Sequence, residues 1–455
     1  MKSEFGKTFK VIISGGSHEP EMTVDISGLP GGFTIDMGDM RKLLERRSPG
    51  GSDYTTSRHE KDLPLLRTEN GDLDLEKVIV PDSGRLCFVI KNEDVDKKAY
   101  DNMLPRPGHA DMPAYFKYNG IADMSGGGPF SGRMTVMLCI AGAIAMQYLK
   151  NSGILISSRV LSIGQAQGTP TDLMEPKPMP MTEYMKDEIE SAKNDGNSVG
   201  GVVEAFAEGL PTGMGGPMYD GIESVLSHIV FGIPAVKGVE FGNGFAASYL
   251  LGSENNDDFV AITGTGKILT ATNNHGGILG GMTTGMPLIM RVAFKPAPSI
   301  SKRQYTVDPK TGRPEELIIK GRHDACFVPR AAAAVEAALA AGLLDVMLSE
   351  DAGKNSVLKT NAENTLSDMR EAIDHIDEKI KILLTERMHI SEDIAKYKIK
   401  HDIPVTDTGR EAIVLDHVGP DLKDIYEKIM EKSREKQNLI LKEHMPHGGK
   451  EAESK

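Results

Sequence analysis

The sequence predicts two domains of different class, a mixed α and β domain followed by an all-helical one. Residues 7–350 alternate short β-branched runs, such as FKVIIS, KVIVP and PLIMRVAF, with alanine-rich stretches such as CIAGAIAMQYLK. From residue 366 onward, apolar residues recur at steps of three and four, which is typical of a long helix that packs along its length. With 455 residues, the chain also exceeds what one hydrophobic core usually organises. The residues alone therefore predict an α/β or α+β domain and then an all-α domain.

The boundary between the two domains is expected where the apolar period is lost, in DAGKNSVLKTNAE. The predicted division is a first domain at 1–352, a linker at 353–363, a helical domain at 364–445 and a flexible tail at 446–455.

The helical domain is predicted to contain three helices. Thr365, with Asp368 three residues later, resembles a capping box at the start of a long helix. Pro404 ends that helix, because proline cannot continue the backbone hydrogen bonding. A second helix is predicted over about 407–418, and a third begins at Pro420, since proline is tolerated in a first helical turn.

One position of the long helix breaks its apolar pattern. The apolar residues run from Leu366 to Tyr397, but position 387, where the pattern requires one, holds Arg387. An unpaired guanidinium at a packing surface costs several kcal/mol, roughly 3–5 by analogy with a broken buried ion pair. An anionic ligand is therefore expected to meet Arg387, which predicts a binding site in this domain.

Composition narrows the function classes. A net charge of −13 and a pI near 5.5 argue against nucleic acid as a partner. Cys87, Cys139 and Cys326 form no CxxC pair, so neither a metal site nor disulfides are expected. The N-terminal MKSEFGKTFKVII does not look like a signal peptide. The apolar stretch at 331–348 contains two acidic residues and is predicted to be a buried helix rather than a membrane span, so we expect a cytoplasmic protein.

Six glycine-rich loops of the first domain each carry a polar side chain. They are SGGSHEP (14–20), RPGHAD (106–111), SGGGPFSGR (125–133), NSVGG (197–201), NNHGGILGG (273–281) and GRHDA (321–325). Backbone amides in such loops can approach a phosphate or a flat ring closely. None matches the dinucleotide or P-loop fingerprint. The loops contain His18, His109, His275 and His323; each alone is more often structural, but an imidazole in such a loop could donate a proton near neutral pH.

These motifs resemble the chorismate synthase family. GKTFKV, SHEP, RRSPG, RPGHAD, GGGxxSGR, SVGG, IPAVKGVEFGNGF, NNHGGILGG, KPAPSI and GRHDA occur in that family's order and spacing over about residues 5–350. The resemblance implies an α+β fold, a β-α-β sandwich. It also implies the use of reduced FMN to eliminate phosphate from 5-enolpyruvylshikimate-3-phosphate, which gives chorismate without net redox change.

Carried over by position, the resemblance assigns roles to residues of this sequence. His18 is similar to the acid that protonates the departing phosphate, and His109 to the histidine that serves the reduced flavin. Asp324, helped by Ser17, is similar to the group that moves a proton at the flavin N5 edge. The residues implied to hold substrate phosphate and carboxylates are Arg47, Arg106, Ser131, Arg133 and Arg322. The residues implied to line the flavin are Pro129, Phe130, Ser131, Pro234, Ala235, Gly280, Lys295, Pro296, Ala297, Pro298, Ser299 and Arg322.

Three departures from the family pattern bear on substrate affinity. GGSHE stands where the family has GESHG, and GGGPFSGRM, with Pro129, stands where it has GGGRSSARE. Asp53, before Tyr54, replaces an arginine. Exchanging a cation for an anion should weaken a nearby phosphate contact.

The tail resembles the small all-helical chorismate mutase family over about residues 360–440. The residues at that family's functional positions are Arg370, Arg387, Lys398, Asp407, Arg410, Glu411, Ser433 and Gln437. Arg387 and Lys398 share a helix face about 16 Å apart along the axis, so their long side chains can reach one small dianion. Arg370 lies ~25 Å from Arg387 and about 100° around the helix. It must serve another pocket, which the family's antiparallel pairing assigns to a partner chain.

The implied second reaction is the rearrangement of chorismate to prephenate, which needs no covalent catalyst. The resemblance implies that Lys398 and Gln437 act at the ether oxygen, where negative charge develops. Glu411 and Asp407 would position the ring hydroxyl and the binding groups. A helix that served only for dimerisation would explain the apolar residues at steps of three and four. It would not explain why Arg387 occupies a position where this pattern requires an apolar residue.

The sequence therefore predicts a bifunctional enzyme that makes chorismate and then consumes it. Two alternatives remain: an active synthase whose helical domain senses chorismate or prephenate, and a flavin-binding protein without turnover that is dimerised by the tail. We identify no NAD(P)H site in the sequence, so an external flavin reductant is expected. The expected assembly is a homo-oligomer, dimeric through the mutase helices and tetrameric through the synthase domain.

Overall fold

The structure is a computed structural model of the chain. It describes residues 2–48, 62–92, 104–121, 125–169, 171–261, 268–319, 324–360, 366–401, 403–404, 406–418 and 422–444. The chain divides into two compact units, Met1–Ser356 and Val357–Lys455, and each is described by itself. Asp53, Tyr54, Arg322, His323, Thr365 and Pro420, and the tail predicted at 446–455, lie outside the described residues.

The first unit contains two large antiparallel sheets. The first sheet has the order β1-β2-β3-β8-β5-β6 and the second the order β10-β9-β11-β17-β12. The strands of the first sheet are β1 (Lys2–Phe5), β2 (Lys10–Gly15), β3 (Glu21–Ser27), β8 (Leu86–Lys91), β5 (Leu65–Thr68) and β6 (Gly71–Leu73). The strands of the second are β10 (Ala166–Gln167), β9 (Leu155–Ile163), β11 (Gly201–Glu208), β17 (Leu288–Phe294) and β12 (Val236–Phe241).

Small hairpins and short helices surround these sheets. The paired short strands are β4 (Thr34–Asp36) with β7 (Lys77–Ile79), β13 (Phe259–Ala261) with β14 (Ile268–Thr270), β15 (Ile278–Leu279) with β16 (Met282–Thr283), and β18 (Gln304–Val307) with β19 (Pro314–Leu317). The peripheral helices are α2 (Asp111–Lys117), α4 (Glu183–Asn194), α6 (Gly252–Asn255), and the 3-10 turns η2 (Ser125–Phe130), η3 (Gly132–Met134), η4 (Met218–Asp220) and η5 (Gly244–Tyr249).

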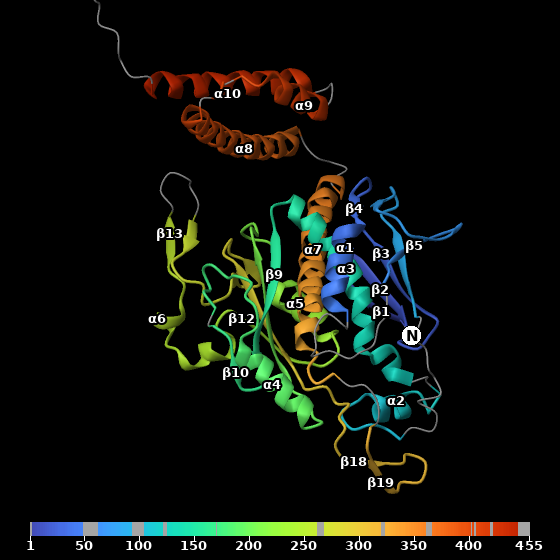
Figure 1. The fold of residues 1–455 in the computed structure, drawn as a ribbon. Coiled ribbons are helices and arrows are strands. Elements are labelled where there is room, and N and C mark those ends of the chain that lie inside the picture. Colours follow the sequence, from blue (N-terminus) through green and yellow to red (C-terminus); the bar gives the residue numbers. More distant parts are fainter. Residues whose placement is uncertain are drawn as a thin grey trace, which may run out of the picture. The chain divides into compact units, whose positions relative to one another are not determined.

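Helices fill the space between the two sheets, so the first unit is a β-α-β sandwich (Figure 1). They are α1 (Met37–Arg47), α3 (Thr135–Asn151), α5 (Ile222–Phe231) and α7 (Val328–Thr360). Helix α3 packs on β2 and β3 of one sheet, on β9 of the other, and on α1. Alternate residues of β3, including Met22, Val24 and Ile26, are buried in this core, as expected for a strand with one covered face.

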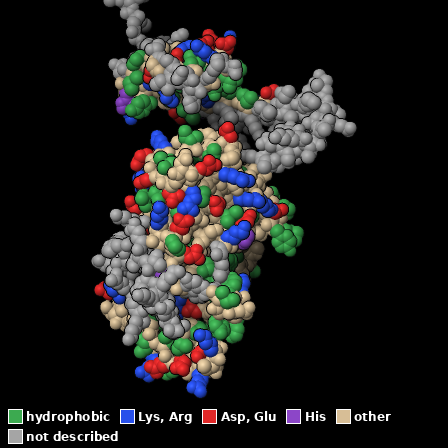
Figure 2. Space-filling view, turned by 90° about the vertical axis from the view of Figure 1, so that its right-hand side faces the viewer, with side chains coloured by type: hydrophobic (Ala, Val, Ile, Leu, Met, Phe, Trp, Pro, Cys, Tyr) green, Lys and Arg blue, Asp and Glu red, His purple; other side chains and the backbone are tan. Residues whose placement is uncertain are grey.

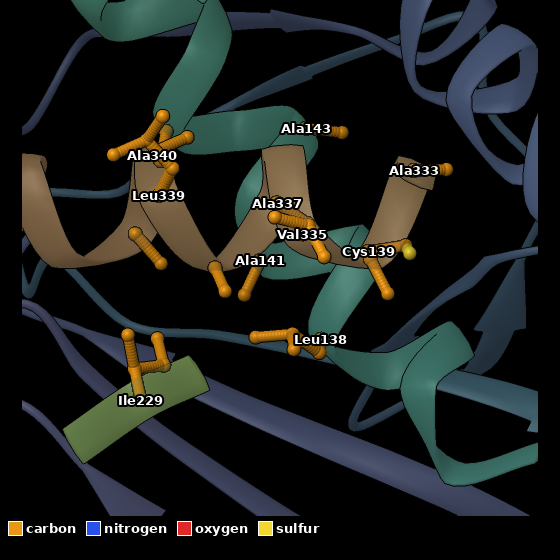
Figure 3. Packing of buried hydrophobic residues seen from close by; sticks show 14 of the residues in the cluster. Leu138, Cys139, Ala141, Ala143, Ile229, Ala333, Val335, Ala337, Leu339 and Ala340 are labelled. Carbon is orange, nitrogen blue, oxygen red and sulfur yellow. The ribbon is translucent and has the colours of Figure 1, made fainter. Parts of the chain in front are cut away.

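Helices α3 and α7 approach each other closely because both are rich in small residues. A Cβ placed on Gly142 of α3 would lie 2.3 Å from the Cα of Ala337 in α7. Figure 3 shows Ala333 and Ala337 of α7 beside Cys139 and Ala141 of α3. Glycine at 142 therefore allows near backbone contact between the two central helices.

The structure confirms most of the elements predicted for the first domain. The runs FKVIIS, KVIVP and PLIMRVAF form β2, β7 and β17, and CIAGAIAMQYLK lies in α3. The stretch at 331–348 lies in α7. The apolar segments Gly132–Asn151 and Val328–Glu350 are long enough to cross a membrane by composition, but 72% and 89% of their residues are buried, so they are core helices.

The segment predicted as a linker is largely helical. Helix α7 continues to Thr360, so 353–360 extend a helix although they lack an apolar period. Once a helix is nucleated, adding residues needs little further stabilisation, and polar residues can prolong it. The domain limits themselves stay a prediction.

The second unit is helical: α8 (Leu366–Lys400), α9 (Thr408–Val418) and α10 (Lys423–His444). Three helices were predicted, and α8 ends four residues before Pro404. Helix α10 packs against both α8 and α9.

Part of the predicted packing surface of α8 is exposed in the single chain. Ile390 is 61% exposed, and Ile380, Ile394 and Tyr397 are also exposed. Among the α8 residues whose side chains the structure describes, Ser391 and Ala395 are buried instead, and they occupy another face of the helix. Periodicity identified the apolar residues but could not show that the chain leaves them uncovered.

Gly142→Ala is expected to destabilise the first unit by about 2 kcal/mol, because overpacking a tight core typically costs 1–3 kcal/mol. The added methyl would meet the Ala337 backbone, which cannot rotate away. Gly342→Ala is the matched control, since its methyl would meet only the flexible end of Leu226, at 2.7 Å. The measurement is thermal and urea unfolding of both variants. A Gly142→Ala midpoint at or above that of the wild type would contradict this account of the core.

Candidate active sites

A large cavity opens where α1 ends and where α3 and α7 begin. Its volume is about 1290 Å³, above the roughly 300–1,000 Å³ of a typical small-molecule site. The wall comprises the end of α1, the loop at 106–111, the η2–η3 region, the α5–β12 junction and the start of α7. The cavity can therefore hold more than one small ligand.

The cavity brings together most of the predicted site residues of the first domain. Those on its wall are Arg47, Arg106, His109, Pro129, Phe130, Ser131, Arg133, Pro234, Ala235, Lys295, Ala297, Pro298, Ser299 and Asp324. Ser17, His18, Gly280 and Pro296 are not wall residues. Gly280 lies instead in the β15–β16 hairpin.

The wall is strongly basic, although the chain is acidic overall. Arg47, Arg106 and Arg133 are all buried at the cavity. The outer face in Figure 2, in contrast, intersperses Lys and Arg with Asp and Glu. Arg106 is oriented by Asp111, whose carboxylate accepts hydrogen bonds from Nε at 2.6 Å and Nη2 at 2.9 Å. Buried guanidiniums of this kind favour a polyanionic ligand.

The geometry of His109 fixes the tautomer of its neutral ring. Nδ1 lies 3.1 Å from the Pro107 carbonyl, which can only accept, so Nδ1 carries the proton. Nε2 lies 2.8 Å from Ser299 Oγ and accepts its hydroxyl proton. Burial, together with the charge of Arg106, lowers the pKa of His109 to about 4. In the absence of an anion the ring is therefore neutral at pH 7.

His18 lies behind the cavity wall. Its ring is 3% exposed, and Nδ1 is 2.9 Å from Ser17 Oγ. Ser17 also approaches the carbonyls of Ser125 and Gly126, at 3.2 Å each. Gly126 has φ 59°, and a Cβ there would lie 2.1 Å from the His18 ring. The glycine loop therefore covers His18 closely, and access to a ligand would require the loop to shift.

Two residues at the cavity were missed by the sequence reasoning. Arg330, on the first turns of α7, forms an ion pair with Asp324, and burial lowers the pKa of Arg330. Asp62 forms ion pairs with Arg47 and Arg133. An arginine inside the apolar run FVPRAAAA was a signal for the first residue. No motif marked the second.

The helical unit contains buried polar atoms that lack partners. Among the described residues, Arg387 Nη1 on α8 and Gln437 Oε1 on α10 are buried without a hydrogen bond. Ser433 is buried beside Ser391, with 2.5 Å between the hydroxyl oxygens. Native proteins rarely leave such groups unsatisfied, so a polar ligand is expected between these helices.

Of the remaining predicted residues of this unit, Asp407 and Glu411 have defined side-chain contacts in the structure. Asp407 accepts a hydrogen bond from the Arg410 backbone at 2.9 Å, which caps α9. Glu411 is paired with Arg434, at 2.6 and 2.8 Å, a partner that the sequence reasoning missed. Lys398 is half-buried near the end of α8. Arg370 lies in α8, and its side chain is outside the described residues.

Comparisons with known proteins agree with this architecture. The chorismate synthase family profile matches residues 9–348, and the chorismate mutase type II profile matches 369–438. A chorismate synthase of Korarchaeum cryptofilum is 42% identical over 356 residues, covering 75% of this chain and 96% of that protein. One of Thermococcus kodakarensis is 42% identical over 363 residues, covering 77% and 99%. A crystal structure of chorismate synthase has a TM-score of 0.58 at 25% identity, covering 76% of this chain and 93% of that one.

A β-α-β sandwich with a large basic cavity defines an enzyme that acts on small anionic molecules. The chain belongs to the chorismate synthase family and carries a chorismate mutase type II domain after the synthase domain. It is thus a bifunctional enzyme of aromatic amino acid biosynthesis, which leads from 5-enolpyruvylshikimate-3-phosphate through chorismate to prephenate. The predicted fold class, family and reactions are confirmed. The synthase family is a soluble one that generally uses reduced FMN.

His109 is expected to stay neutral well below pH 6 in the ligand-free protein. Its folded pKa of about 4 is below the ordinary value of 6.5. Protonation therefore favours the unfolded chain, and the stability that neutral His109 contributes is lost as the pH falls from about 6.5 to about 4. The measurement is an NMR titration of ¹⁵N-labelled imidazoles, with the His109 signal identified by its absence in His109→Gln. A midpoint above pH 6 would contradict the burial argument.

Proposed function

We propose that the first domain uses reduced FMN, bound in the large cavity, to release phosphate from 5-enolpyruvylshikimate-3-phosphate. The observation that carries the proposal is the convergence of Arg47, Arg106 and Arg133 with His109 and Asp324 on one wall. The substrate bears a phosphate and carboxylates, which suit bidentate guanidinium contacts. Arg322 is proposed as a further contact to both substrate and flavin.

The cavity wall has the chemistry that a flavin mononucleotide requires. Pro234, Ala235 and Pro298 lie on this wall and would present apolar surface and backbone to a flat ring, while Lys295 would supply a cation for the phosphate. Ala235 has φ 74°, a conformation that non-glycine residues seldom adopt outside functional sites. When bound, the reduced flavin would lend and recover an electron, so that the elimination proceeds without net redox change.

The residues around the flavin supply proton transfer. Asp324, held by Arg330, is proposed to accept a proton at the flavin N5 edge. His18, oriented by Ser17, is proposed to protonate the departing phosphate once the Gly126 loop admits it. His109 is proposed to donate to the anionic flavin, since an adjacent anion would raise the lowered pKa of its ring.

In the helical domain, we propose that chorismate binds between α8 and α10. Arg387 Nη1 and Gln437 Oε1, buried and without partners among the described residues, would be satisfied by this ligand. Arg387 and Ser433 would hold a carboxylate. Lys398 and Gln437 would stabilise the charge that develops on the ether oxygen, and Glu411 would hold the ring hydroxyl.

A second copy of the chain is proposed to complete the mutase site. Ile380, Ile390, Ile394 and Tyr397 form an exposed apolar surface along α8, which suits antiparallel pairing with the same helix of another chain. Such pairing would bring Arg370 of each chain to the other's site. A tetramer through the synthase domain, an external flavin reductant and a cytoplasmic location complete the proposal.

Both activities are expected in a single anaerobic reaction. Full-length protein, supplied with 5-enolpyruvylshikimate-3-phosphate and chemically reduced FMN, should release phosphate and form prephenate, with chorismate as a transient. The measurement follows the three products together.

Each failure of this assay has a distinct meaning. Chorismate that accumulates without prephenate would make the helical domain a sensor. Mutase activity without phosphate release would make the first domain a flavin-binding protein without turnover. Turnover driven by NADPH alone would refute the external reductant.

Arg387→Ala should lower mutase activity by about 10²–10³, the effect of losing one transition-state donor, and leave phosphate release unchanged. Arg370→Ala should do the same. Co-expressed in equal amounts, the two variants should recover about a quarter of wild-type mutase activity, because random pairing rebuilds one intact site in each mixed dimer. The control is Lys396→Ala, whose exposed side chain pairs only with Asp393 among the described residues, at 3.0 Å. Failure of the mixture to recover any activity would exclude sharing of Arg370.

A further inference from the structure

One buried carboxylate joins two of the arginines in the synthase cavity. The side chain of Asp62 is 2% exposed. Its Oδ2 accepts hydrogen bonds from Arg47 Nη1 at 2.7 Å and from Ser48 Oγ at 2.6 Å, and its Oδ1 accepts one from Arg133 Nη1 at 3.1 Å. Asp62 therefore lies between two cations that come from different helices.

Both arginines also have other hydrogen bonds. Arg47, at the end of α1, also donates to Thr135 Oγ1 at 3.2 Å and to backbone carbonyls of Gly132 and Arg133 at 3.4 and 3.3 Å. Arg133, before α3, donates from Nε to Asn92 Oδ1 at 2.8 Å. Among the residues that the structure describes, the Asp62 carboxylate is an anionic link between the two guanidiniums, and it is one of the contacts that hold them at their spacing.

The charge balance gives Asp62 a second effect. Two guanidiniums buried in one wall repel each other, and the Asp62 carboxylate offsets part of this charge. Without Asp62 the same point would attract any small anion more strongly, but with its two arginines less well placed.

We propose that Asp62 is a positioning residue of the synthase reaction, which fixes Arg47 and Arg133 at the spacing that binds an anionic group of the substrate and keeps free phosphate weakly bound. The proposal rests on the synthase function proposed above. An ion pair that only stabilises the fold predicts a lower free energy of unfolding when Asp62 is replaced, but it does not predict tighter inhibition by phosphate.

The test uses the full-length protein with Asp62→Asn and Asp62→Glu. Asp62→Asn should lower kcat/KM for phosphate release ~100-fold, as expected when binding groups are misplaced by about 1 Å. At the same time, inorganic phosphate should inhibit roughly two- to fivefold more tightly, because one negative charge is lost beside the arginines. Asp62→Glu keeps the charge but shifts the carboxylate, so it should lower kcat/KM while phosphate inhibition stays near the wild-type level.

The control is Asp74→Asn, which removes the carboxylate of a surface ion pair between Asp74 and Arg41, 2.5 Å apart. This variant should change neither kcat/KM nor the inhibition by phosphate. Because the helical unit is a separate compact unit, mutase activity reports only the amount of chain, and the thermal unfolding of each variant is compared with that of the wild type to show that the first unit is folded. A wild-type kcat/KM in Asp62→Asn, or weaker phosphate inhibition in it, would overturn the inference. If Asp62→Asn does not fold, Asp62→Glu decides, since unchanged kcat/KM there would also overturn it. Absence of phosphate release by the wild type would instead refute the proposed function.

Discussion

The close approach of α3 and α7 determines where the synthase site can form. Because Gly142 lies against Ala337, the two helices share the centre of the sandwich with almost no side-chain volume between their backbones. Both helices begin at the cavity. Arg133 and Ser131 precede α3, whereas Asp324 and Arg330 lie at the start of α7. The packing of small residues in the core thus sets the distance between groups that bind anions and groups that can move a proton.

The charged side chains of the synthase site are oriented by ion pairs with other charged side chains. Asp111 orients Arg106, Asp62 links Arg47 and Arg133, and Arg330 pairs with Asp324. Each arginine therefore reaches the cavity with part of its hydrogen-bonding capacity already used and its orientation restricted. A ligand that meets such preorganised groups loses less free energy to reorganisation than it would with flexible side chains.

Local sequence patterns predicted much of this fold, and their limits have physical causes. The runs in β2, β7 and β17 and the helix α3 were recognisable because periodicity and β-branched content are local properties. The family motifs predicted most of the cavity wall. No motif marks Asp62, and Arg330 is marked only by its place inside an apolar run, since the partners of both residues are set by tertiary contacts. His18 was recognisable as a candidate, but its burial behind Gly126 depends on how the η2 loop folds over it. In the same way, the heptads of α8 revealed which residues are apolar without showing what covers them.

Because of the apolar surface of α8, the stability of the helical unit would depend on how much of it is bound to a second copy of the chain. A surface with Ile390 and Ile394 in water carries a free-energy cost that is removed when a second copy covers it. The folded fraction of this unit would then depend on the concentration of the chain, whereas the described cavity of the first unit is formed within one chain. Dilution would therefore lower mutase activity relative to synthase activity. Although both domains lie on one polypeptide, the ratio of the two activities would depend on the concentration of the enzyme.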